Sequence, residues 1–144
     1  MTFTLHGRWQ TRILLLGGLG LPLTAVFAWL YGSMMPFALL AYVVLLGMGW
    51  DVIYYRLQSL RWNRDWPPLF VLLTGLWEGL FLWLLVNLPG RAGVTLPGIT
   101  PALTLGRFAA HYLTVFCITW VASHSLLPIL FPRWRFRGGQ WFPG

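Results

Sequence analysis

The chain has 144 residues, of which 58% are hydrophobic and 9% are charged, and its mean hydropathy is +0.68. Soluble domains carry about a quarter charged residues, and a water-soluble chain of this length could not hide so much apolar surface. The net charge is +7 and every one of the 10 basic residues is arginine. Because these arginines flank apolar segments, we expect anionic lipid head groups, and no nucleic acid, as their partners. The single cysteine, Cys117, excludes an internal disulfide.

Four apolar stretches are long enough to cross a membrane as helices. We predict spans over about 13–31, 36–55, 67–88 and 108–131. The link between the first two is very short, so the second helix must return antiparallel beside the first. Pro22 predicts a kink in the first span. The predicted fold is an all-α membrane protein, a single transmembrane domain over residues 1–144 with four helices in up-down order.

The connecting segments differ in composition. Residues 56–66 predict a cytoplasmic link in the head-group layer, where Leu57, Leu60 and Trp62 share one face of a short helix. Residues 89–107 are rich in Gly, Pro and Thr and predict an outer loop. The tail, 132–144, alternates arginine with aromatic residues, which predicts a strand or an extended segment at the interface.

The distribution of arginine predicts the orientation of the chain. With four spans, eight arginines share one side, and only Arg91 and Arg107 fall on the other. The positive-inside rule makes the eight-arginine side cytoplasmic, so both termini are expected there. The eight expected to contact lipid head groups are Arg8, Arg12, Arg56, Arg61, Arg64, Arg133, Arg135 and Arg137. Five tryptophans are expected in the same interface: Trp9, Trp62, Trp66, Trp134 and Trp141.

Glu78 lies near the middle of the third predicted span, where an ionised carboxylate is costly. It is therefore either protonated or directed toward a polar partner inside the protein. Such a group serves as a proton, metal or substrate site, or as a structural hydrogen bond between helices. The candidate partners by depth are Thr119, Ser123, His124 and Asp51.

The residues Gly75 and Gly79 bracket Glu78 as a G-x-x-x-G pattern. This pattern allows a second helix backbone to approach closely, so both glycines are candidate helix-contact residues. On a helical wheel they share one broad face with Glu78, which predicts that Glu78 faces a neighbouring helix.

Asp51, Glu78 and His124 can converge in the cytoplasmic half of one bundle. Two carboxylates and an imidazole can relay protons or bind a divalent metal, although Asp51 can also bond Tyr55 or Arg56 at the boundary. A lone His111 near the outer end of the fourth span can ligate a haem or chlorophyll, or can be an interfacial, hydrated side chain. No catalytic motif is present, and the sequence identifies no cofactor and no metal site.

These features favour a non-enzymatic role. We expect a small accessory or scaffold subunit that docks in a larger membrane complex or assembles with copies of itself. The alternative is a small transporter or channel that moves protons, cations or a small solute past Asp51, Glu78 and His124. A membrane enzyme with a metal at that cluster comes last. We expect the protein in a bacterial plasma (inner) membrane or an internal membrane derived from it.

Overall fold

The computed structural model describes residues 3–91, 93–100 and 103–142, with the side chains of residues 89–91 outside that description. Every regular element in this part of the chain is helical. The elements are α1 (Leu5–Leu15), the π-helical turn η1 (Leu16–Gly20), α2 (Leu21–Tyr31), α3 (Met35–Ser59), α4 (Pro68–Arg91), α5 (Leu105–His124), α6 (Leu126–Leu130) and α7 (Pro132–Phe136).

Four helical segments are long and apolar enough to cross a membrane, as the sequence predicts. They are Leu5–Tyr31, Met35–Leu60, Pro68–Leu88 and Leu105–Leu130. The shortest has 21 residues, which at about 1.5 Å per residue matches the hydrocarbon thickness of a bilayer. The chain therefore has the build of an integral membrane protein.

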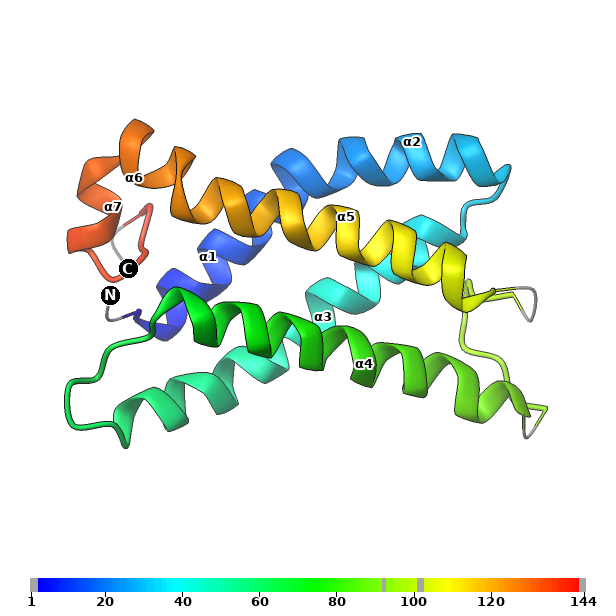
Figure 1. Ribbon diagram of the computed structural model, residues 1–144, viewed down its shortest axis with the longest axis horizontal. Coiled ribbons are helices and arrows are strands. Elements are labelled where there is room, and N and C mark those ends of the chain that lie inside the picture. The colour runs from blue at the N-terminus through cyan, green and yellow to red at the C-terminus, as the bar shows by residue number, and fades with distance from the viewer. Residues whose placement is uncertain (1–2, 92, 101–102, 143–144) are drawn as a thin grey trace.

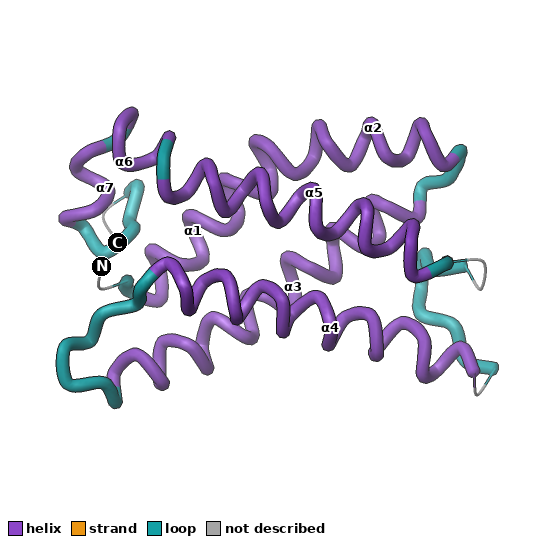
Figure 2. Tube along the Cα trace, viewed as in Figure 1, coloured by secondary structure: helices purple, strands orange, loops and turns teal. Residues whose placement is uncertain are grey.

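The long helices alternate in direction, and both ends of the chain lie at the same end of the molecule (Figure 1). The tube view shows the loops gathered at the two ends of the molecule (Figure 2). The first span, α1 with α2, packs against α3 and α5, and α4 packs against the same two helices. As a result, α1 and α4 face each other diagonally across the molecule.

The first helix begins earlier than the sequence predicts. It starts at Leu5, not near residue 13, because the Thr4 hydroxyl accepts a hydrogen bond from the Gly7 amide at 3.0 Å and caps the helix. This places two of the expected head-group arginines, Arg8 and Arg12, inside the helix. The bend expected from Pro22 is present. The π turn Leu16–Gly20 lies directly before α2, which has Pro22 in its first turn, and the helix changes direction there (Figure 1).

The prediction for the second link is wrong in detail. The helix α3 continues to Ser59, and no separate interfacial helix follows it. Leu60 and Trp62 are 82% and 104% exposed, whereas Trp66 is only 5% exposed. Trp66 therefore packs against the protein, and its depth relative to the head groups stays a prediction.

The tail is also different from the predicted strand or extended segment. It forms the short helix α7, in which Pro132 occupies the first turn, and then turns back against α1. The Trp134 indole donates a hydrogen bond to the Thr11 hydroxyl at 3.0 Å, and the Thr4 amide donates one to the Gly138 carbonyl at 2.9 Å. These contacts hold residues 134 to 139 over the first two turns of α1.

The half of the molecule away from the termini has an apolar core. Met35, Leu39, Leu82, Val86 and Phe108 are all less than 9% exposed and belong to one packed cluster. Polar side chains gather instead in the half that carries the termini, which positions the site described next.

Candidate functional site

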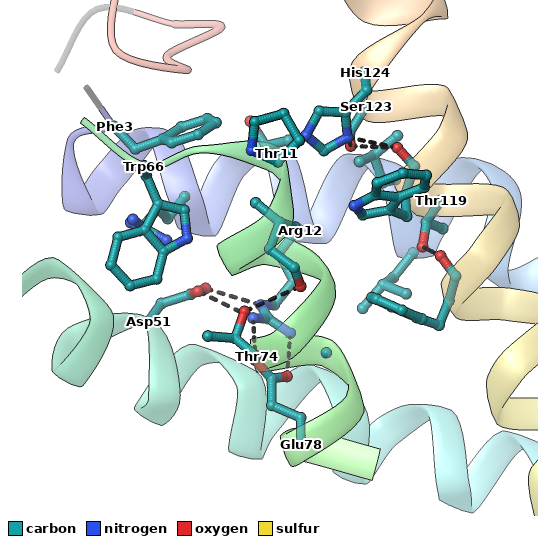
Figure 3. A pocket seen from close by; sticks show the side chains of 18 of the residues that line it. Phe3, Thr11, Arg12, Asp51, Trp66, Thr74, Glu78, Thr119, Ser123 and His124 are labelled. Carbon is teal, nitrogen blue, oxygen red and sulfur yellow. Dashed lines mark hydrogen bonds and ion pairs between the residues drawn. The ribbon is translucent and has the colours of Figure 1, made fainter. Parts of the chain in front are cut away.

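A three-residue ion cluster joins α1, α3 and α4. The Arg12 Nε donates to Asp51 Oδ2 at 2.8 Å, and its Nη2 donates to Asp51 Oδ1 at 3.0 Å. On the other side, Nη1 donates to Glu78 Oε2 at 2.9 Å and Nη2 donates to Glu78 Oε1 at 3.1 Å (Figure 3). Each carboxylate is thus bound by the planar guanidinium at two points, the arrangement that gives arginine its strongest pairs.

This cluster is almost closed to solvent. The side chains of Asp51 and Glu78 are 5% and 9% exposed, and that of Arg12 is 18% exposed. Four of the five guanidinium N–H groups are used. Because hydrogen bonds satisfy the buried charges, the cluster compensates for their loss of hydration.

Glu78 thus faces protein and has a polar partner, as expected. The partner, Arg12, was not among the candidates, because the sequence placed it in the head-group layer. That expectation for Arg12 is wrong, since helix α1 carries it about two turns into the molecule. The signal available in the sequence was charge balance: two intramembrane carboxylates need a cation at similar depth.

A cavity of about 460 Å³ lies above the cluster, bounded by α1, α4, α5 and the tail (Figure 3). Its deep end is formed by buried residues, among them Glu78 and Tyr112, and its wall is mainly apolar and aromatic. Its exposed lining residues are Pro68, His124 and Arg135. Since these exposed residues mark the mouth, the cavity opens between the start of α4 and the end of α5.

His124 lines this cavity but does not join the ion cluster. Its Nδ1 lies 2.8 Å from the Ser123 hydroxyl and 2.8 Å from the Trp120 carbonyl oxygen. The predicted meeting of Asp51, Glu78 and His124 is therefore replaced by a cluster in which Arg12 takes the third place. Among the described residues, no group of three His, Cys, Asp or Glu side chains is placed to hold a metal ion.

The glycines of α4 lie against aromatic rings of α5. A Cβ added at Gly75 would collide with the Phe116 ring, and one added at Gly79 would collide with the Tyr112 ring. The Tyr112 hydroxyl also donates to the Gly75 carbonyl at 2.6 Å. These contacts hold α4 and α5 together at the wall of the cavity, which Gly75, Tyr112 and Phe116 also line.

His111 is buried and not hydrated. It is 2% exposed, and its Nε2 lies 3.0 Å from the Thr24 hydroxyl, with the Phe27 ring 5.3 Å away. Because Nε2 already has this partner, ligation of a haem or chlorophyll through it would require breaking a buried hydrogen bond. The alternative interpretation of His111 as a hydrated side chain is wrong, because the side chain is buried.

Arg8 lies one helical turn from Arg12 and also lines the cavity. Its Nη2 donates to Gln58 Oε1 at 2.6 Å, and its guanidinium carbon lies 4.7 Å and 5.2 Å from the ring centres of Trp66 and Phe3. Within the described residues its Nε is buried without a hydrogen-bond partner. Arg8 is therefore a second internal cation that sequence reasoning assigned to the head groups.

The other arginines expected at the head groups lie at the end of the molecule that carries both termini. Arg56, Arg64, Arg133, Arg135 and Arg137 are exposed, and their contact with lipid stays a prediction. Arg61 is half-buried, and its guanidinium carbon lies 4.6 Å from the Phe70 ring centre. At the opposite end, the Arg107 guanidinium lies 5.3 Å from the Tyr31 ring centre. The side chain of Arg91 lies outside the described residues.

Comparison of the chain with protein-family models, with curated proteins and with solved structures found no match. The functional argument therefore rests on the geometry of the cavity and of the ion cluster.

Proposed function

We propose that this chain is a non-catalytic membrane subunit that binds one amphiphilic molecule in the cavity between α4 and α5. The observation that carries the proposal is the cavity itself, about 460 Å³ in volume, with the Arg12–Asp51–Glu78 cluster at its base. Ligand sites are typically concave and mostly apolar, with a few fixed polar groups. This cavity has that composition and lies within helices that are apolar enough to span a membrane.

The walls suit a ligand with an elongated apolar part. Val71 of α4 faces the cavity from one side, and Phe116 and Trp120 of α5 face it from the other. The wall hydroxyls of Thr74 and Thr119 donate to carbonyls of their own helices, which leaves them as weak acceptors toward the cavity. An apolar chain can therefore lie along this wall without leaving strong donors unsatisfied.

A transport pathway is less well supported. Beyond Glu78 and Tyr112 the interior is filled by the apolar cluster that includes Leu39 and Leu82. Ions need a continuous polar or water-filled route, and buried apolar packing opposes one. The polar groups of the Arg12–Asp51–Glu78 cluster are also already bound to one another. This favours a fixed structural role for them over the conduction of ions.

The wider setting that the sequence suggests stays a proposal. An accessory or scaffold subunit, either within a larger membrane complex or as copies of this chain, would present its bound amphiphile to a neighbouring subunit. The orientation with both termini in the cytoplasm is supported by the arginine distribution and by the position of both ends on one side of the molecule (Figure 1). A bacterial inner membrane, or an internal membrane derived from it, fits the same pattern.

A cavity-filling variant tests the proposal. Val71→Trp places an indole in the cavity, so we expect the amount of amphiphile that co-purifies with the full chain to fall at least about tenfold, the effect of about 1.4 kcal/mol in binding. The measurement is native mass spectrometry of protein released from membranes. Leu73→Trp is the matched control, because Leu73 is on the same helix but is 53% exposed and outside the cavity.

Equal occupancy in both variants, or an empty wild-type protein, would rule out the cavity as the binding site. Retained helicity by circular dichroism in Val71→Trp separates a filled cavity from a failure to fold.

A further inference from the structure

We propose that the ligand of this cavity carries an anionic phosphate head group, bound by the cavity-lining residues Arg8 and Arg135, while its apolar part lies between α4 and α5. This inference rests on the proposed function and specifies the chemistry of the ligand. It is carried by Arg8, a cavity-lining arginine whose Nε–H has no hydrogen-bond acceptor among the described residues, and by the apolar wall of that cavity.

Arg8 has the features of a binding group. Within the described residues both nearby buried carboxylates, Asp51 and Glu78, are bound by Arg12, and the side-chain partner of Arg8 is the neutral Gln58. Its Nε–H is buried with no acceptor in the described chain. A buried N–H without an acceptor is costly, and an oxyanion that accepts a hydrogen bond from it would remove that cost.

The surroundings hold Arg8 in one orientation. Its guanidinium lies over the rings of Trp66 and Phe3, and the Phe3 ring in turn lies 5.9 Å from that of Trp134. A planar guanidinium stacked in this way presents its N–H edge in a fixed direction. This ordering lowers the entropic cost of binding a phosphate.

Arg135 brings a second positive charge to the lining of the same cavity. It follows Trp134 in α7, it lines the cavity, and its side chain is exposed at the mouth. Asp65 also lines the cavity but already has an interaction of its own. The Arg12 cluster at the base, with two carboxylates to one guanidinium, is net negative. It repels an anionic head group, which favours the part of the cavity lined by Arg8 and Arg135 over the base.

The test compares two lipids with identical acyl chains. The full chain is reconstituted in phosphatidylcholine vesicles that contain equal amounts of phosphatidylglycerol and diacylglycerol, and the bound species are counted by native mass spectrometry. We expect the wild type to prefer phosphatidylglycerol. In the double variant Arg8→Gln/Arg135→Gln we expect the ratio of bound phosphatidylglycerol to bound diacylglycerol to fall about tenfold, the effect of one charge-assisted hydrogen bond. Total occupancy should be kept.

A matched control removes the same charge elsewhere. Arg133→Gln/Arg137→Gln changes two exposed arginines of the tail that do not line the cavity, so the preference should be unchanged. An equal loss in this control would assign the effect to surface charge and overturn the inference. Arg8→Lys, which keeps the charge but not the planar fork, should keep part of the preference and guards against a folding defect in the double variant.

The outcomes separate this inference from the proposed function. If Val71→Trp empties the cavity but the double variant keeps the wild-type preference, the site binds an amphiphile through some other chemistry and the inference fails alone. If Val71→Trp leaves occupancy unchanged, both fail. Excess glycerol phosphate distinguishes the source of the phosphate: displacement of the lipid indicates a water-soluble phosphate ligand, and no displacement indicates a lipid head group.

Discussion

Arg12→Leu is expected to destabilise the folded protein by about 3–5 kcal/mol, because it leaves two buried carboxylates without a counterion. The variant removes all four guanidinium hydrogen bonds that join α1 to α3 and α4. The measurement is reversible unfolding in mixed micelles, followed by circular dichroism. Arg56→Leu, at an exposed arginine of α3, should change stability by no more than about 0.5 kcal/mol.

Neutralising the carboxylates separates charge from packing. Arg12→Leu combined with Asp51→Asn and Glu78→Gln buries no net charge, so most of the lost stability should return. Glu78→Gln alone should be mild, because Arg12 still pairs with Asp51 and the amide oxygen still accepts a hydrogen bond. Glu78→Leu should be worse than Glu78→Gln. If Arg12→Leu were as stable as the wild type, the cluster would have no structural role.

Trp134→Ala is expected to release the C-terminal tail from α1. The ring is 4% exposed, and its indole donates to Thr11, whose hydroxyl in turn donates to the Gly139 carbonyl at 3.1 Å. Large-to-small substitutions of buried aromatic residues cost about 3–5 kcal/mol. Amide hydrogen exchange in residues 134 to 142 should therefore accelerate by about 100-fold or more, as expected for local opening.

The control for the tail is Phe136→Ala in the same short helix, because Phe136 is 89% exposed. It should leave exchange near the wild-type rate. Unchanged protection in Trp134→Ala would mean that the tail is held by its backbone hydrogen bonds to Thr4 and Gln10 and not by the indole. Protection in α4 should be the same in all three proteins, since the tail opens locally.

The helical spans were predictable from sequence because lipid requires long apolar helices, and that requirement leaves a clear composition signal. The helix start at Leu5 was not, because it depends on a single cap by Thr4. The tail was mistaken for an extended segment because its alternation of Arg and aromatic residues also fits a five-residue helix with one buried face, around Trp134. Short patterns of this kind do not separate the two periods.

The candidate site was partly predictable. Glu78 was identifiable, since a carboxylate within an apolar span must find a partner. Its partner Arg12 depends on how far α1 extends and on the diagonal approach of α1 to α4, which no local pattern encodes. Arg8 was missed for the same reason. The cavity is lined by residues of α1, α3, α4, α5 and the tail, so it is a property of helix packing and not of any one helix alone.

The most direct test of cavity binding is photocrosslinking with a lipid that carries a diazirine in its acyl chain. After reconstitution and illumination of the full chain, peptide mapping should place the label on cavity-facing positions, chiefly Val71, Phe116 and Trp120. Val71→Trp should abolish this labelling. Label confined to outward positions such as Leu73 and Leu113, which are 53% and 43% exposed, would show ordinary contact with bulk lipid and would contradict a bound amphiphile.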